Sequence, residues 1–324
     1  MRTVFLILIG LLIPQTVLCP ADKLPNLGKD ASAYNNRGNQ LHRQGRYDQA
    51  ITDYTAAISL NPDFALAFLN RSISYYEKGE YPQAIADATE ALRLNPSFSD
   101  AFEHRGLAYK RSGDMNRARS DYTEAIRLNP QKATAYSNRG NVQSDMDLAI
   151  ADYTEAIRLD PNYAIAYFNR GIIHTEKGDP EQAIEDFTRA IRLRPNYADA
   201  YFNRGNAYRS IDELDLAIED YTDTLRLRPV YVAAHLNRGI AYYRKGEFDL
   251  AIEDYTAALQ LDPDNAVLYN NRGAAYYKRG DISLAAADFE MALQLAPNLA
   301  PAVRNRDRTL GQNPGAEGYE ASLY

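Results

Sequence analysis

Cysteine is almost absent from this sequence: Cys19 is the only one among 324 residues. One cysteine excludes an intrachain disulfide and the paired-cysteine spacing of a zinc site. Positive charge is not in excess either, because 36 Lys and Arg stand against 43 Asp and Glu, for a net charge of −7. This balance gives little electrostatic support for nucleic-acid binding.

Motifs of catalysis are also missing. The sequence has neither a phosphate-cradling glycine loop nor a nucleophile elbow. The four histidines stand at four different places of a repeated pattern, where other copies have Tyr, Asn or similar residues: His42, His104, His174 and His235. A substitution at a structural position explains them better than a metal or catalytic role. We therefore expect no enzyme activity, no metal site and no cofactor.

Long apolar runs are absent except at the N-terminus. Arg2 precedes the run from Val4 to Ile13, which is short for a bilayer core of about 30 Å. A polar stretch then leads to Cys19-Pro20-Ala21, which is typical of a signal peptide over residues 1–21. The alternatives are a lipid on Cys19, a retained membrane anchor or a buried helix. We expect an exported protein, periplasmic or secreted, with membrane contact only if this segment is retained or Cys19 is lipidated.

Proline marks an internal repeat. The closing prolines are 34 residues apart, except for one interval of 31: Pro62, Pro96, Pro130, Pro161, Pro195, Pro229, Pro263 and Pro297. A period of this length is typical of a stacked-repeat solenoid. The eight copies are residues 30–62, 63–96, 97–130, 131–161, 162–195, 196–229, 230–263 and 264–297. Each copy predicts two helices around a turn, usually with a glycine, at Gly45, Gly79, Gly113, Gly178, Gly246 and Gly280.

The fourth copy and the two ends depart from this pattern. Gly140 and Ala149 are nine residues apart, where the neighbouring copies have twelve, and no turn glycine lies between them. A loss of three residues, nearly one helical turn, predicts a shortened first helix and a local irregularity. Residues 22–29 are predicted as a linker, residues 298–310 as a capping helix, and residues 311–324 as a disordered tail.

Small residues recur where the two helices of a copy must approach each other. The first helix has Gly38, Gly106, Gly140, Gly171, Gly205, Gly239 and Gly273, with Ser72 as the exception. The second helix has an alanine in every copy, at Ala50, Ala84, Ala118, Ala149, Ala183, Ala217, Ala251 and Ala285. An aromatic residue follows four positions later, at Tyr54, Tyr122, Tyr153, Phe187, Tyr221, Tyr255 and Phe289, with Ala88 as the exception. We expect the aromatic ring to fill the space beside the glycine.

This pattern resembles the tetratricopeptide repeat (TPR) over about residues 30–297. The resemblance implies an all-α, right-handed superhelical solenoid of helix–turn–helix repeats, with the first helices on its concave surface. Two features differ from the family. Its usual tryptophan is replaced by Tyr34, Phe68, Phe102, Tyr136, Tyr167, Tyr201, His235 and Tyr269. Its usual leucine before the glycine is an arginine in every copy.

That arginine is matched by an equally regular aspartate on the second helix. The arginines are Arg37, Arg71, Arg105, Arg139, Arg170, Arg204, Arg238 and Arg272. The aspartates are Asp53, Asp87, Asp121, Asp152, Asp186, Asp220, Asp254 and Asp288. A guanidinium can hold a carboxylate through two bonds, so we predict ion pairs within a copy or between adjacent copies. Binding of anionic partners by the arginines is the alternative.

An asparagine precedes the arginine in seven copies: Asn36, Asn70, Asn138, Asn169, Asn203, Asn237 and Asn271, with His104 as the break. The series resembles the asparagine ladder of the TPR superhelix in O-linked GlcNAc transferase, where the side chains hold the backbone of an extended peptide. An amide offers one acceptor and two donors, which match a peptide group. The alternative is that these asparagines bond within the solenoid.

The best functional interpretation is a scaffold or adaptor that binds extended segments of protein partners on its concave face. The alternative is a self-associating structural module without a peptide ligand. A carboxylate clamp, as used by TPR domains that hold chaperone tails, is rejected because Asp100 and His104 stand where basic residues are required.

Overall fold

The computed structural model describes residues 28–311, so the predicted signal segment 1–21, most of the linker and the tail beyond Gly311 lie outside the described residues. Within this range the chain forms 17 helices and no strand. The first helices of the successive repeats are α1 (Ala31–Arg43), α3 (Ala65–Glu77), α5 (Ser99–Arg111), α7 (Ala133–Gly140), α9 (Ala164–Lys177), α11 (Ala198–Ser210), α13 (Val232–Lys245) and α15 (Ala266–Arg279). The second helices are α2 (Tyr47–Leu60), α4 (Tyr81–Leu94), α6 (Met115–Leu128), α8 (Met146–Leu159), α10 (Pro180–Leu193), α12 (Leu214–Leu227), α14 (Phe248–Leu261) and α16 (Ile282–Leu295), and α17 (Ala300–Thr309) ends the series.

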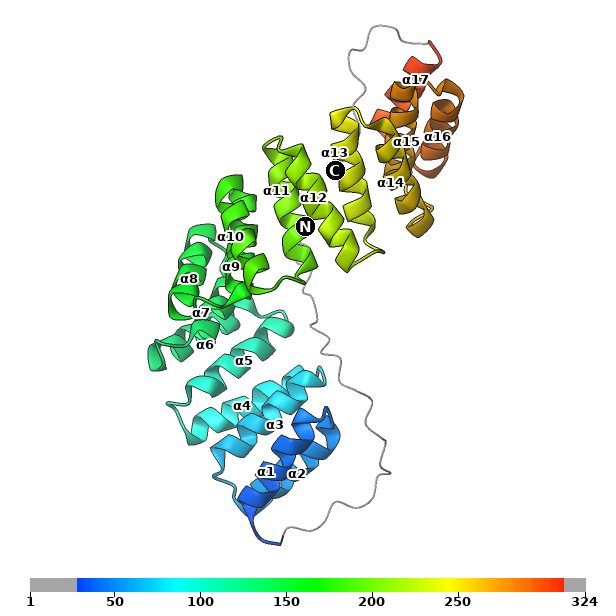
Figure 1. The fold of residues 1–324 in the computed structure, drawn as a ribbon. Coiled ribbons are helices and arrows are strands. Elements are labelled where there is room, and N and C mark those ends of the chain that lie inside the picture. Colours follow the sequence, from blue (N-terminus) through cyan, green and yellow to red (C-terminus); the bar gives the residue numbers. More distant parts are fainter. Residues whose placement is uncertain (1–27, 312–324) are drawn as a thin grey trace.

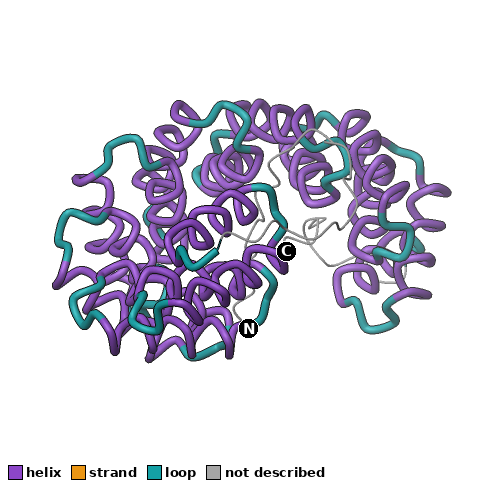
Figure 2. The backbone as a smooth tube through the Cα atoms, turned by 90° about the horizontal axis from the view of Figure 1, so that it is seen from below, coloured by secondary structure: helices purple, strands orange, loops and turns teal. Residues whose placement is uncertain are grey.

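The helix pairs stack side by side into a superhelical solenoid (Figure 1), which is seen along its length as an open ring in Figure 2. Each first helix packs on its own second helix, and each second helix packs on the first helix of the next repeat. Apart from the short α7, first helices also contact the next first helix, as α1 does with α3 and α13 with α15, whereas second helices make no comparable contact with one another among residues 28–311. The first helices therefore lie on the inner side of the curve.

The glycine on each first helix allows the two helices of a repeat to approach closely. A Cβ built on Gly239 would lie 2.6 Å from Cε1 of Tyr255, and one on Gly38 would lie 2.5 Å from Cε1 of Tyr54. The two exceptions in the sequence compensate for each other in the second repeat. Ala88 leaves room for the side chain of Ser72, whose Oγ donates to the carbonyl oxygen of Ala84 at 2.7 Å.

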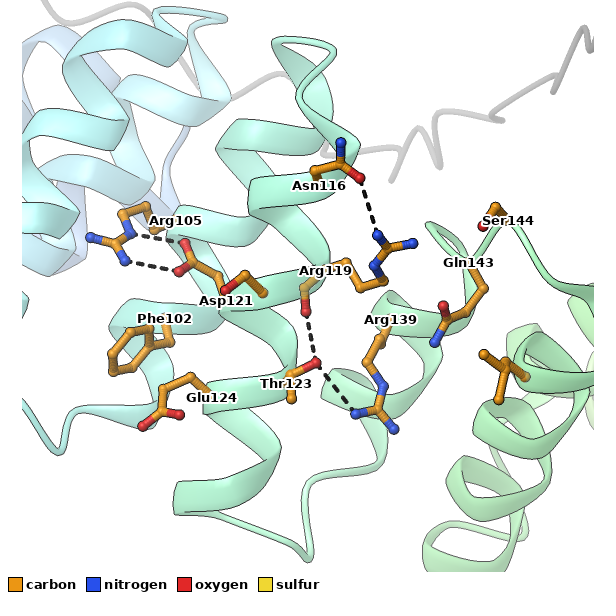
Figure 3. Close-up of a pocket in the computed structure, with 12 residues that line it drawn as sticks. Phe102, Arg105, Asn116, Arg119, Asp121, Thr123, Glu124, Arg139, Gln143 and Ser144 are labelled. Atoms are coloured by element: carbon orange, nitrogen blue, oxygen red, sulfur yellow. Dashed lines mark hydrogen bonds and ion pairs between the residues drawn. The ribbon is translucent and has the colours of Figure 1, made fainter.

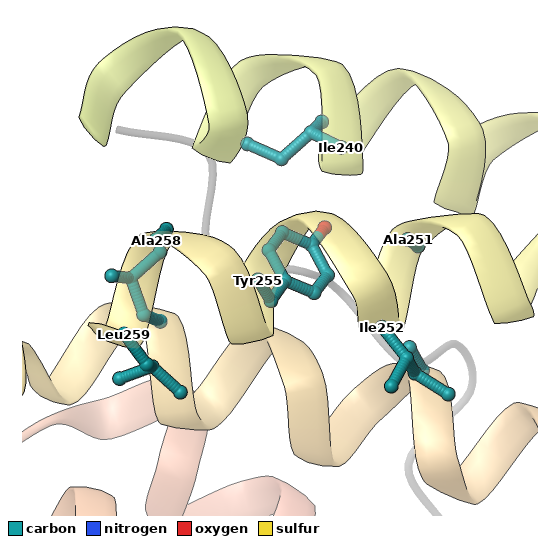
Figure 4. Close-up of a cluster of buried hydrophobic side chains, with 8 residues drawn as sticks. Ile240, Ala251, Ile252, Tyr255, Ala258 and Leu259 are labelled. Atoms are coloured by element: carbon teal, nitrogen blue, oxygen red, sulfur yellow. The ribbon is translucent and has the colours of Figure 1, made fainter. Parts of the chain in front are cut away.

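The hydrophobic core continues from one repeat to the next (Figure 4). The largest cluster joins Ile240 of α13, Tyr255 and Leu259 of α14, and Leu268 and Ala275 of α15. Because α15 belongs to the following repeat, each repeat buries its second helix by means of its neighbour. None of the helices between residues 28 and 311 is both long and apolar enough to cross a lipid bilayer.

Six of the seven inter-helix turns outside the fourth repeat contain a glycine with positive φ, between 73° and 100°. In the sixth repeat the same place is taken by Asp212, with φ of 65°, the only such non-glycine residue among residues 28–311. The side chain of Asp212 accepts a bond from Nη2 of Arg244 at 2.8 Å.

The fourth repeat has the shortened first helix that the sequence predicts. Helix α7 has 8 residues, whereas the other first helices have 13 or 14. Just beyond the end of α7, Val142 still packs with Ala118 and Tyr122 of the third repeat, so the apolar contact between the two repeats is kept. Asp145 then begins the second helix by accepting bonds from the backbone N–H groups of Asp147 and Leu148. The missing turn therefore lies at the corner between α7 and α8.

Candidate functional site

Each first helix carries an arginine that forms an ion pair with the aspartate of its own repeat. In the sixth repeat, Nε of Arg204 donates to Oδ2 of Asp220 at 2.8 Å, and Nη2 donates to Oδ1 at 2.7 Å. The same pairing joins Arg37 to Asp53, Arg71 to Asp87, Arg105 to Asp121, Arg139 to Asp152, Arg170 to Asp186, Arg238 to Asp254 and Arg272 to Asp288. All eight carboxylates are buried. The sequence left open whether the pairs link adjacent repeats, and the structure places both partners in one repeat.

A third donor of the arginine reaches the preceding repeat. Nη1 of Arg204 donates to Oγ1 of Thr188 at 3.0 Å, and the equivalent bonds join Arg71 to Thr55, Arg105 to Thr89, Arg139 to Thr123, Arg170 to Thr154, Arg238 to Thr222 and Arg272 to Thr256. Sequence analysis missed these threonines, although one follows the aromatic position in each of the first seven copies. The eighth copy has Glu290 at this position, and the cap rather than another full repeat follows it. Threonine is therefore present wherever the next repeat supplies an arginine to bond with it.

The ion pairs are desolvated. The hydrogen bond to Asp121 raises the pKa of the Arg105 guanidinium above its ordinary value, although burial acts in the opposite direction. Burial raises the pKa of the Asp220 carboxyl, although the bond from Arg204 acts to lower it. Because the carboxylates are buried and already neutralised, the arginine series is poorly placed to bind external anions.

The ladder asparagines lie on the first helices, and several form bonds between successive first helices. Nδ2 of Asn70 donates to Oδ1 of Asn35 at 2.9 Å, and Nδ2 of Asn138 donates to Oε1 of Glu103 at 2.9 Å. Asn169 bonds to Asn141 at 3.0 Å, and Asn237 to Asn206 at 2.8 Å. These bonds use one of the two amide hydrogens of each ladder residue.

The hydrogen-bond acceptor of each ladder asparagine depends on which residues of the preceding first helix face it. Phe168 and Ile172 occupy the facing positions before Asn203, so Nδ2 of Asn203 donates instead to the carbonyl oxygen of Asp199 on its own helix, at 2.7 Å. An eighth asparagine, Asn305 of α17, was not predicted from the sequence, even though it continues the period at the ninth position of the series. It is buried, and its Nδ2 donates to Oδ1 of Asn270 at 3.0 Å.

Exposure divides the ladder into two parts. Asn237 is 7% exposed and Asn271 is fully buried. Asn36 is exposed, and four further members are half-buried, namely Asn70, Asn138, Asn169 and Asn203. The amides open to a ligand therefore belong to the first six repeats, and the C-terminal members lie in the interior.

A second group of amides on the first helices is used by the core. Oδ1 of Asn39 accepts a bond from the hydroxyl of Tyr54 at 2.8 Å, and Asn141 and Asn206 do the same for Tyr153 and Tyr221. Where this position is apolar, the hydroxyls of Tyr122 and Tyr255 are buried without a hydrogen-bond partner among the described residues. These asparagines are therefore explained by the folded structure alone.

A small cavity of about 230 Å³ lies between α1 and α3. It is lined by Asn39, His42, Arg43 and the ladder residue Asn70, together with Tyr54 and Ile73. Nδ1 of His42 lies 2.9 Å from Oγ of Ser74, and burial lowers the pKa of His42. The cavity thus combines amide, imidazole and guanidinium groups beside the exposed part of the ladder.

His104, the break in the ladder, lies beside a cluster of charged side chains. Burial lowers the pKa of His104, and Nζ of Lys132 contacts both Asp100 and Glu103. Asp100 and Glu103 are thus already neutralised by a base of this chain. No group of three or more His, Cys, Asp or Glu side chains is placed to hold a metal ion in the part of the chain that the structure describes.

Comparison with protein-family models gives matches to tetratricopeptide repeats along most of the described residues. A family model described as "TPR repeat" matches residues 74–113, 143–178, 171–211, 205–246 and 241–280. Models described as "Tetratricopeptide repeat" match residues 31–64 and 266–299, and residues 99–132. No curated protein matches.

Among solved structures, YrrB, "a TPR protein with an unusual peptide-binding site", matches with a TM-score of 0.54 and 24% identity, over 57% of this chain and 97% of that chain. The APC/C hetero-tetramer Cut9–Hcn1 matches with a TM-score of 0.53 and 20% identity, over 87% of this chain and 56% of that chain. At these identities both comparisons show the fold.

Proposed function

Because this chain belongs to the tetratricopeptide repeat family, we propose that it is a non-catalytic scaffold that binds extended segments of protein partners along its inner surface. Proteins with this repeat bind protein or peptide partners, and the fold described above is such a scaffold. The observation that carries the finer proposal is the row of amides on the inner helices, at Asn36, Asn70, Asn138, Asn169 and Asn203.

The chemistry of an amide suits a peptide backbone. In Asn70, Asn138 and Asn169 the bond to the neighbouring helix uses one N–H and orients the side chain. The second N–H and the acceptor oxygen can then pair with the C=O and N–H of a ligand. A row of such groups at repeat spacing recognises an extended chain largely independently of its side chains, and the cavity at Asn39 and His42 adds a place for one side chain.

A peptide selected from a random display library against the purified protein tests this proposal. Asn36→Ala and Asn203→Ala should each weaken binding about five-fold, since one lost hydrogen bond is worth about 1 kcal/mol. Gln182→Ala is the matched control, because it removes an exposed amide from the second helix α10. N-methylation of the peptide backbone should weaken binding more than alanine substitution of its side chains. Equal effects of the inner and control variants would reject the inner surface as the binding site.

We further propose that residues 1–21 direct export. The support is the sequence pattern of a single arginine, a short apolar run and a small-residue site before Asp22. Fractionation of cells that make the full chain should place it outside the cytoplasm, and deletion of residues 2–21 should retain it there. Retention of the full chain in the cytoplasm would contradict export.

Self-association remains a second candidate because of one specific observation. The second helices of four repeats expose a leucine at the same position, with 55%, 39%, 40% and 49% exposure at Leu148, Leu216, Leu250 and Leu284. Exposed apolar residues that recur on one face favour contact with another protein surface. Light scattering over a range of concentrations distinguishes the two candidates, because self-association requires a mass that rises with concentration.

A further inference from the structure

The missing turn of the fourth repeat removes an ion pair that other repeats use. A base at the end of a first helix pairs with an acid at the start of the preceding second helix: Lys78 with Asp48, Lys177 with Asp147, Lys245 with Asp215 and Arg279 with Asp249. In the fourth repeat the turn that would carry the base is absent. The position of the acid in the third repeat is taken by the neutral Asn116.

A second substitution accompanies the missing turn. Six of the eight repeats have an isoleucine directly after the small alanine of the second helix, and the last has Ala286. Ile184 shows its usual role, because it packs on a cluster that includes Ala207 of the next first helix. The third repeat has Arg119 instead. Where the covering turn is lost, the sequence therefore has a cation in place of the apolar side chain.

The result is a notch of about 860 Å³ between α6 and the α7–α8 corner (Figure 3). Its polar lining includes Asn116, Arg119, Thr123, Arg139, Gln143 and Ser144. Nη2 of Arg119 donates to Oδ1 of Asn116 at 3.1 Å. None of the ladder asparagines lines the notch.

The charges around the notch are balanced except at Arg119. Arg105 pairs with Asp121, Arg139 pairs with Asp152, and Glu124 pairs with Arg127. Among the described residues, no carboxylate lies within ion-pair distance of Arg119. One unneutralised guanidinium, flanked by amide and hydroxyl groups, has the donors needed for a single carboxylate. A polyanion such as nucleic acid would need several unneutralised cations.

We propose that this notch binds an acidic side chain, Asp or Glu, of a protein partner, and that Arg119 is the anchor of the site. The amides of Asn116 and Gln143 and the hydroxyl of Ser144 supply further hydrogen-bond groups around the carboxylate. The site is separate from the amide ladder, so it does not depend on peptide binding at the inner surface.

The test uses a fluorescein-labelled hexaglutamate peptide and the full chain, with binding followed by fluorescence anisotropy at low ionic strength. The wild type should bind with a dissociation constant below 1 mM, and Arg119→Gln and Arg119→Ile should weaken binding about ten-fold, the value of one charge-assisted bond. Arg117→Gln is the matched control, because it removes the same charge from the same helix and Arg117 does not line the notch. Circular dichroism verifies that each variant is folded.

Four results would overturn the proposal. The first is no binding of hexaglutamate to the wild type up to 1 mM. The second is an equal loss in the variants of Arg119 and Arg117, which would mean that net charge alone attracts the peptide. The third is equal binding of hexaglutamine, which would mean that the carboxylate is not recognised. The fourth is displacement of hexaglutamate by inorganic phosphate at matched ionic strength with the same potency per charge, which would mean a general anion site.

Discussion

Two junctions between neighbouring repeats show which contacts the stack requires. Between the sixth and seventh repeats, Lys245 pairs with Asp215 at 2.6 Å, and Nη1 of Arg238 donates to Thr222 at 2.9 Å. Between the third and fourth, the equivalent ion pair at the inter-helix corner is absent, and the bond from Arg139 to Thr123 is longer, at 3.5 Å. The fourth and the seventh repeat both retain their Arg–Asp pair, and Val142, just beyond α7, still packs on Ala118 and Tyr122 of the third repeat.

Stacking of the third and fourth repeats therefore persists with the Arg–Asp pair and the Val142 contact, without the corner ion pair. The fourth repeat lacks one turn of its first helix and the corner ion pair, and the third repeat lacks the isoleucine, yet the helices still stack. The polar notch lies at this corner, where the turn is missing.

The largest expected effect is the loss of a buried arginine. Arg204→Ala leaves the carboxylate of Asp220 buried without its partner and should lower the free energy of unfolding by about 3–5 kcal/mol. Arg139→Ala should cost less, because Nε2 of Gln143 still donates to Asp152 at 3.0 Å. Urea unfolding followed by circular dichroism measures both. The control Arg226→Ala removes an exposed arginine and should cost about 0–1 kcal/mol; an equal cost for Arg204→Ala would contradict the account.

A smaller effect is expected from filling the space at a glycine. Gly239→Ala places a Cβ against the ring of Tyr255 and should cost about 1–3 kcal/mol through overpacking. The second repeat shows the alternative solution, because Ser72 is accepted opposite Ala88. The same unfolding measurement applies, and an unchanged midpoint for Gly239→Ala would show that the ring can move at no cost.

Two tyrosines differ in the hydrogen bonds of their hydroxyls. Tyr221→Phe removes the bond donated to Asn206 and the longer bond accepted from Nε of Arg209, and should cost about 1–2 kcal/mol. Tyr255→Phe removes a buried hydroxyl without a partner among the described residues, so its cost should be close to zero. Thermal unfolding of the two variants side by side measures this difference, and equal shifts in the melting temperature would count against the assigned bonds.

The smallest effect concerns pH. Burial lowers the pKa of His104 in the folded state, beside Glu103, Lys132 and Asp100. The unfolded chain then binds more protons below the ordinary histidine pKa of about 6.5, so stability falls as the pH decreases through that value. His104→Asn, which restores the residue found in the other copies, should flatten the pH dependence of the unfolding midpoint between about pH 7 and pH 5. An unchanged slope would show that His104 does not contribute.

Much of the fold could be predicted from the sequence, because the same structural residues recur at the same positions in each repeat. The prolines, the turn glycines and the glycine–aromatic pairs predict the helices, and the missing three residues predict the short α7. The bonds of Asn70 and Asn138 could not be predicted, since they depend on which residue of the preceding helix faces the amide. Arg119 and Asn116 were not predicted as site residues, because their role depends on where the missing turn lies relative to α6.

The inner amide row is the central claim, and the side-chain NH₂ resonances of the asparagines test it most directly. In a ¹⁵N-labelled sample titrated with the selected peptide, the resonances of Asn36, Asn70, Asn169 and Asn203 should shift in a saturable manner. Those of the buried Asn237 and Asn305 should stay in place. Saturable shifts confined to asparagines away from the first helices, with the inner set unchanged, would contradict the account.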